Sequence, residues 1–203
     1  MKKLACCVLM WVLAACVWGY DLRLDGVSAL WRVRNLWLDA GAFVPTTTAG
    51  AGTSTAESTT NKIMNDLLAF DATTQEYGQV RVSLPPEWDY GSVKIKLYWT
   101  TAYAAESGVV FDIRGLSASD GATIDTALGE SVSVSDTNTG ANKVNITAAS
   151  AAITLAQTPA KGDVLWLEVY RNTAAAGDVV ESDVSLLGVL LQYTESPVVS
   201  ETW

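Results

Sequence analysis

Hydrophobic and polar positions alternate strictly through residues 77–103, YGQVRVSLPPEWDYGSVKIKLYWTTAY. A period of two residues predicts β-strands with one face in a core and the other toward water. Pro85 and Pro86 end the first strand because proline cannot donate a ladder hydrogen bond, and Gly91 allows a turn before the second strand. We therefore expect a β-hairpin with a tight polar turn, whose core-facing positions are Val80, Val82, Leu84, Val93, Ile95, Leu97 and Trp99.

Similar patterns predict further strands at 66–70, 108–113, 131–135, 144–147, 153–155, 163–171 and 184–193. Residues 163–171 are apolar on both faces, which favours a central position, and Gly188 indicates a bulge. An apolar sheet face must be covered by another layer. About eight strands with polar turns and almost no helical period predict an all-β fold, a two-sheet antiparallel β-sandwich that is jelly-roll-like.

The chain of 203 residues is long enough for one domain with a sizeable core. We assign residues 37–195 to this jelly-roll domain and residues 196–203 to a C-terminal tail. Residues 46–60 are rich in Thr, Ala, Gly and Ser without an apolar period, so we expect an exposed loop there. Residues 20–36 are either a connector or an extra hairpin around Asp25-Gly26.

Residues 1–19 combine two lysines with an apolar run too short for a comfortable membrane-spanning helix. The tetrapeptide Leu13-Ala14-Ala15-Cys16 resembles the lipobox of bacterial lipoproteins, which makes Cys16 a candidate lipid attachment site. The alternatives are a hydrophobic N-terminal arm packed inside an assembly and a wrongly assigned start codon. Only a lipoprotein signal would make a membrane a partner of this chain.

The composition excludes several classes of partner and functional site. A formal net charge of −9 argues against a nucleic-acid partner, which requires clustered Lys and Arg. The absence of histidine removes the commonest general base and most zinc and copper sites. Cysteine occurs only at Cys6, Cys7 and Cys16, so no disulfide framework holds the body. We predict no enzyme activity, no catalytic residues, no cofactor and no metal.

Several residues are candidates for a metal site or a catalytic site. The segment from Asp136 to Gly140 begins like a calcium loop but has Thr147 where the closing glutamate belongs, so it is interpreted as a polar turn. Asp112 and Glu168 suit a glycosidase-type carboxylate pair, but pairing with arginine or exposure to water is favoured. The candidate arginines are Arg114 and Arg171.

Two further candidates lie outside these segments. Trp88 and Tyr90 are candidate surface aromatic residues that would stack on a sugar ring, or else they plug the end of the sandwich. Asn145-Ile146-Thr147 fits a glycosylation acceptor, a triplet that is common by chance.

The order of segments over about residues 37–195 resembles a group of tailed-bacteriophage virion structural proteins of tail-fibre or capsid-associated type. The matching positions, in chain order, are Trp37, Ala40, Gly41, Ala42, Pro45, Phe70-Asp71, Pro86, Trp88, Gly162-Asp163, Tyr170-Arg171 and Tyr193. The first 36 residues depart from this pattern.

The resemblance implies a non-catalytic capsid decoration or tail-fibre module on the virion surface that mediates assembly or attachment. Its implied partners are further copies in a homo-oligomer, other virion proteins of the capsid or tail, and a host-surface glycan. The alternative is a bacterial surface lipoprotein, lipid-anchored at the outer surface, with a carbohydrate- or protein-binding β-sandwich.

Overall fold

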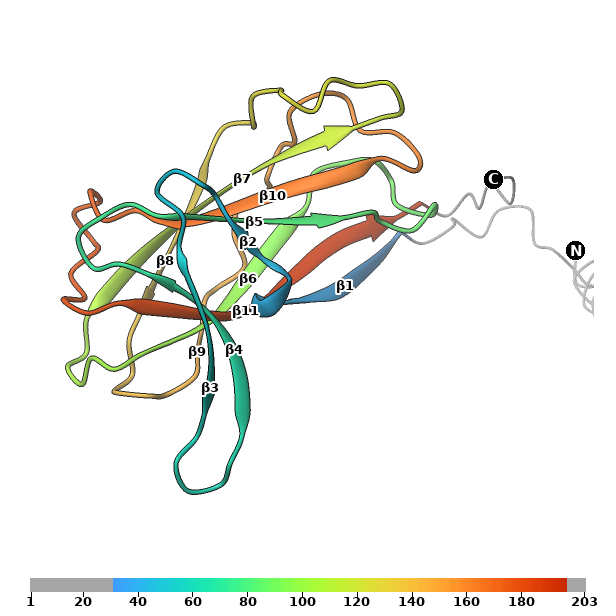
Figure 1. The fold of residues 1–203 in the computed structure, drawn as a ribbon. Coiled ribbons are helices and arrows are strands. Elements are labelled where there is room, and N and C mark those ends of the chain that lie inside the picture. The colour runs from blue at the N-terminus through green and yellow to red at the C-terminus, as the bar shows by residue number, and fades with distance from the viewer. Residues whose placement is uncertain (1–30, 197–203) are drawn as a thin grey trace, which may run out of the picture. The chain divides into compact units, whose positions relative to one another are not determined.

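The computed structural model describes residues 31–196, and these form two antiparallel β-sheets packed face to face (Figure 1). Sheet A contains β1 (Arg32–Asp39), β3 (Gly52–Glu57), β4 (Met64–Phe70), β6 (Lys94–Thr101), β9 (Asn145–Ile146) and β11 (Val184–Glu195). Sheet B contains β2 (Val44–Pro45), β5 (Tyr77–Val82), β7 (Gly108–Ala118), β8 (Val132–Thr137) and β10 (Val164–Arg171). A 3-10 turn, η1 (Ala40–Ala42), links β1 to β2.

The chain passes repeatedly from one sheet to the other. Sheet A has the order β3-β4-β11-β6-β9, with β1 also pairing with β11, and sheet B has the order β2-β5-β10-β7-β8. Consecutive strands therefore lie mostly in opposite layers, as in a jelly roll. The predicted fold class, an all-β antiparallel sandwich, is confirmed.

The core lies between the two sheets and follows the alternation read from the sequence. Each predicted core-facing position of the segment from Val80 to Trp99 is buried except Val82, which is half-buried. The remaining core is made of apolar residues that alternate along the other strands, including Phe70, Phe111, Ile113, Leu165, Leu167, Leu186 and Leu191. Burying each such side chain contributes about 1.5–3 kcal/mol, so packing alone supplies the main stabilisation.

The predicted hairpin at residues 77–103 is wrong in its pairing, although both strands are present. β5 belongs to sheet B and β6 to sheet A, so their apolar faces meet across the core. Residues 83–93 cross the end of the sandwich, where the backbone N–H of Trp88 donates to the carbonyl oxygen of Pro85 at 2.9 Å. Alternation fixes which face of a strand is buried, but it does not distinguish a neighbour in the same sheet from a strand in the opposite one.

The predicted exposed loop at 46–60 contains a strand. All six residues of β3 are exposed, yet its backbone pairs with β4 from Gly52↔Ala69 to Glu57↔Met64. The β3–β4 hairpin extends away from the rest of the sandwich (Figure 1). A strand that is exposed on both faces has no apolar period, so the hydrophobic pattern of the sequence does not predict β3.

The predicted bulge in β11 is confirmed, because the register against β6 shifts between Leu186 and Gly188. A side chain at position 188 would begin 2.3 Å from Cζ2 of Trp37, so glycine is needed where β1 pairs with β11. β10 and β11 are both central strands, as expected for β10 from its sequence. Ile153, which was predicted to start a strand, makes only an isolated bridge with Val93.

One ion pair is fully enclosed. Arg171 and Asp178 are 0% and 2% exposed, and Arg171 Nη2 lies 2.6 Å from Asp178 Oδ1. The guanidinium also donates to the carbonyl oxygens of Val180 and Ser182. These bonds attach residues 172–183, which connect β10 to β11, to the end of β10.

The N-terminal predictions fall largely outside the described residues. Residues 1–30 include Cys16 and the turn at Asp25-Gly26, so both remain predictions. β1 begins at Arg32, inside the segment that was assigned to a connector or hairpin. Within residues 31–196, no helix has the length and hydropathy that crossing a membrane requires.

Candidate functional site

The outer face of sheet B, meaning the side turned away from the core, carries polar and aromatic side chains in three cross-strand rows. Alternate residues of a strand share a face, and residues opposite each other in register are neighbours. The upper row is Arg81, Trp166 and Leu116; the middle row is Gln79, Glu168 and Arg114; the lower row is Tyr77, Tyr170 and Asp112. Each row takes one residue from β5, one from β10 and one from β7.

The middle row is a complete hydrogen-bonded chain. Glu168 is 3% exposed, and its Oε1 accepts from Arg114 Nε at 2.7 Å and Nη2 at 2.6 Å. Its Oε2 accepts from Gln79 Nε2 at 2.8 Å. A buried carboxylate is tolerated only when paired and hydrogen-bonded, and both conditions are met here. The predicted pairing of Glu168 with Arg114 is confirmed, and Gln79 keeps an acceptor oxygen that makes no bond within the described residues.

The lower row is held by aromatic contacts. The rings of Tyr77 and Tyr170 lie 5.1 Å apart, and the Arg114 guanidinium carbon lies 5.9 Å and 5.7 Å from their centroids. A cation over aromatic faces is attracted to them. The Tyr170 hydroxyl is 2.9 Å from Ser131 Oγ, and burial raises the pKa of Tyr170. The lower and middle rows therefore share Arg114 as a common partner.

Asp112 ends the lower row and is also satisfied. It is 5% exposed and accepts from Ser133 Oγ at 2.5 Å and from Asn172 Nδ2 at 2.9 Å. Neither candidate arginine pairs with Asp112, because Arg114 is bonded to Glu168. Arg171 is bonded to Asp178. In the alternation along β10 it shares a face with the core residues Leu167 and Val169.

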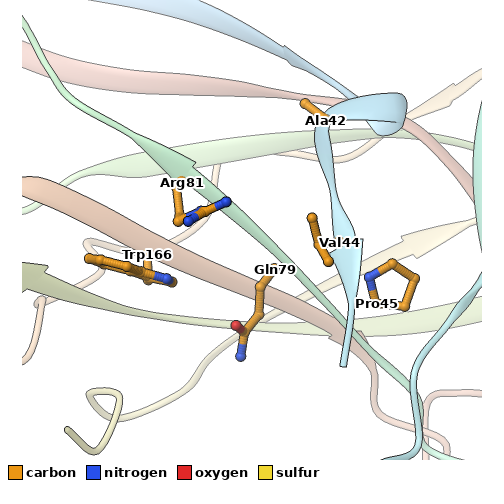
Figure 2. A pocket seen from close by; sticks show the side chains of 6 residues that line it. All are labelled: Ala42, Val44, Pro45, Gln79, Arg81 and Trp166. Atoms are coloured by element: carbon orange, nitrogen blue, oxygen red, sulfur yellow. The ribbon is translucent and has the colours of Figure 1, made fainter. Parts of the chain in front are cut away.

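The upper row borders a shallow pocket of about 270 Å³ (Figure 2). Trp166 lies on one side, the segment Ala42–Pro45 lies on the other, and Gln79 and Arg81 lie between them. Trp166 is half-buried, whereas Arg81 and Val44 are exposed. The pocket thus combines an indole, an apolar wall, a guanidinium and an amide on a rigid sheet.

The structure brings Asp112 and Glu168 onto neighbouring strands, two register positions apart on the same face. The sequence offered no means of placing them together. Each carboxylate accepts hydrogen bonds from two fixed side chains. This arrangement suits structural acceptors that order the face.

The predicted surface aromatic residues lie elsewhere. Trp88 is 3% exposed and packs edge-on against Tyr90, with ring centroids 5.7 Å apart. Its indole therefore belongs to the core at the end of the sandwich and presents no free face, which corrects the surface assignment of Trp88. Tyr90 is half-buried, and its hydroxyl donates to the carbonyl oxygen of Pro86 at 3.1 Å. A ligand contact by Tyr90 stays a prediction.

The remaining candidate motifs have structural roles. Asn138 is 0% exposed and its amide donates to the carbonyl oxygens of Tyr103 and Ala105, as befits a turn. Asn145 is 4% exposed and accepts from Thr139, so it is not an accessible glycosylation acceptor. In the described part of the chain, no group of three or more histidine, cysteine, aspartate or glutamate side chains is arranged to hold a metal ion.

No family model matches the sequence, and no curated protein matches it either. Among solved structures, the chain is similar to the CBM22-2 xylan-binding domain from Paenibacillus barcinonensis Xyn10C, with 12% identity, a TM-score of 0.45, and coverage of 78% of this chain and 98% of that one. It is similar to the CBM36-1 domain of a multidomain xylanase from the hindgut metagenome of Trinervitermes trinervoides, with 8% identity, a TM-score of 0.40, and coverage of 81% and 100%.

A further likeness is to the enzymatically active domain of tailspike protein 4 of Bacteriophage CBA120. The identity is 11%, the TM-score is 0.38, and the match covers 84% of this chain but only 20% of that one. None of these likenesses assigns a ligand or an activity to this chain.

Proposed function

We propose that this domain is a non-catalytic attachment module that binds a glycan on the outer face of sheet B. The observation that carries the proposal is the pocket between Trp166 and the Ala42–Pro45 segment, with Gln79 and Arg81 between them. A sugar ring has an apolar C–H face and a rim of hydroxyls. An aromatic ring beside a few fixed polar groups is complementary to that pattern.

The face is ordered before any ligand arrives. Glu168 fixes Gln79 and Arg114 through bonds of 2.6–2.8 Å, and Arg114 in turn lies against both tyrosines. Side chains that are already immobilised lose little conformational entropy on binding, which favours affinity. These ordered side chains lie beside the pocket on the same face of sheet B.

Binding without catalysis fits the state of the two carboxylates. A glycosidase requires one carboxyl group as acid and another as nucleophile or base beside the scissile bond. Asp112 and Glu168 instead serve as acceptors for Ser133, Asn172, Arg114 and Gln79. If a glycan were cleaved, the variants Asp112→Asn and Glu168→Gln would test these residues, and unchanged hydrolysis in both would remove them as catalysts.

The biological setting is a separate proposal that rests on the ordered segments of residues 37–195. We place the module on a virion surface, as a capsid decoration or fibre-type homo-oligomer in contact with other virion proteins. The alternative is a bacterial outer-surface lipoprotein attached through Cys16. The N-terminal mass of the native chain distinguishes them, since a lipid-bearing start at Cys16 supports the alternative and an intact Met1 supports the first setting.

The glycan proposal is tested with the full chain and a glycan array, followed by calorimetry on retained glycans. Trp166→Ala should weaken binding at least tenfold, which corresponds to about 1.4 kcal/mol. The matched control is Trp37→Ala, since Trp37 is 44% exposed on sheet A and should leave binding unchanged. Failure of the wild-type chain to retain any glycan, or equal losses in both variants, would contradict the proposal.

A further inference from the structure

Arg81 is an exposed cation with no partner in the described residues. It makes no ion pair or side-chain hydrogen bond there, whereas Arg34, Arg114 and Arg171 each contact a carboxylate at 2.6–2.8 Å. An unpaired arginine is not unusual on a surface. What distinguishes Arg81 is that it is the one charged residue among the six that line the pocket.

The strand register explains why no carboxylate neutralises Arg81. Its direct partner on β10 is Trp166. On the other side, the β2 ladder consists of Val44 and Pro45, so the chain beside Arg81 continues into η1. Glu168 stands two positions away along β10 and is fully engaged by Arg114 and Gln79. The positive charge of Arg81 therefore stays unneutralised at the pocket.

The lining of the pocket defines a complementary ligand. Trp166, Val44 and Pro45 offer apolar surface, Arg81 offers its guanidinium, and Gln79 offers an acceptor oxygen that makes no bond within the described residues. Guanidinium groups bind carboxylates through two parallel hydrogen bonds. A volume of about 270 Å³ is below the range of about 300–1,000 Å³ typical for drug-sized ligands, so the pocket suits one sugar unit.

We propose that this pocket selects an acidic sugar, a uronic or ulosonic acid unit within a longer glycan. Its carboxylate lies on Arg81, its ring packs against Trp166, and one hydroxyl donates to the Gln79 carbonyl oxygen. This inference rests on the proposed function, because it names the class of glycan that the same face binds. The chain has a net charge of −9 and therefore does not attract anions non-specifically. A positively charged pocket on such a chain favours specific binding of an acidic ligand.

The test uses three acidic probes, polygalacturonate, glucuronoxylan and a sialylated oligosaccharide, each paired with its carboxyl-reduced form. At least one acidic probe should bind the full chain at least tenfold more tightly than its reduced form, as expected for a charge-assisted hydrogen bond. Arg81→Gln should abolish that preference, because it weakens binding of the acidic form much more than binding of the reduced form. Raising the salt concentration should shrink the preference because exposed charges are screened.

Arg32→Gln is the matched control, because Arg32 is an exposed arginine on β1 in sheet A and the charge change is the same. It should keep the full preference for the acidic probe. If glycans bind in a Trp166-dependent way but acidic and reduced forms bind equally, the acidic-sugar inference fails and the proposed function stands. If no glycan binds, or Trp166→Ala has no effect, the proposed function fails and this inference fails with it.

Discussion

The substitution Arg171→Met should destabilise the domain strongly. The Arg171 guanidinium is 0% exposed and donates to Asp178 at 2.6 Å and to the carbonyl oxygens of Val180 and Ser182. Methionine fills a similar volume but donates nothing. The substitution therefore leaves a buried carboxylate without its counter-charge and two carbonyl groups without their donor.

The magnitude follows from the burial of the pair. Removing one partner of a buried ion pair costs about 3–5 kcal/mol, because the remaining charge stays desolvated. For a chain of this size, each kcal/mol lowers the melting temperature by about 2–4 °C. We therefore expect a decrease of roughly 6–20 °C. Asp178→Asn removes the charge but keeps an acceptor, so its cost should be smaller, and the double variant should lose less than the sum of both.

Urea and thermal unfolding of the full chain, followed by circular dichroism, measure these losses. Lys62→Met is the matched control, because Lys62 pairs with Glu57 at 2.9 Å while their side chains are 65% and 47% exposed. Exposed pairs contribute about 0–1 kcal/mol. A loss for Arg171→Met no larger than that for Lys62→Met would show that the enclosed pair does not hold residues 172–183 in place.

Two further predictions concern single side chains. Trp88→Phe should keep the free energy of unfolding within about 1 kcal/mol of the wild-type value, because it removes a buried indole N–H that has no partner in the described residues. Trp88→Ala should lower the free energy of unfolding by about 3–5 kcal/mol, because it removes a buried ring. Equal losses for the two variants in chemical denaturation would contradict this prediction. Hydrogen bonds from the backbone N–H groups of Thr73 and Thr74 and from the Thr73 hydroxyl lower the pKa of Asp71 from 3.8 to about 2. Because the folded-state pKa is depressed, the stabilisation is present above the unfolded pKa and is lost as the pH falls from about 4 toward 2. Asp71→Asn should remove this part of the pH dependence, and an NMR titration of Asp71 near 4 would refute the assignment.

Much of the fold was predictable because alternation is a local signal. The buried faces of β5 and β6 follow directly from their sequences, and Gly188 correctly marks the bulge in β11. Pairing is not local. Nothing in residues 83–93 indicates that the chain changes sheets there, since a tight turn and a crossover use the same Pro and Gly residues.

The candidate site was missed for a related reason. Trp166 and Tyr170 made β10 apolar on both of its faces, which favoured burial on both sides. Glu168, placed between them on the same face, was the available signal that this face is polar in part. The partners that turn these residues into a binding face come from β5 and β7, roughly fifty to ninety residues earlier in the chain.

The unneutralised positive charge of the pocket depends on the register of β5 against β10. If β5 slipped by two residues against β10, Arg81 would stand opposite Glu168 and be neutralised, and Gln79 would stand opposite Tyr170. Gly78 opposes this slip, because a Cβ atom at its position would lie 2.4 Å from Cδ2 of the buried Leu68. The slip would move Val80 into that place, where its Cβ atom would force the buried Leu68 side chain to shift. The glycine under Leu68 thus fixes, from the core side, the alignment that leaves Arg81 free on the opposite face.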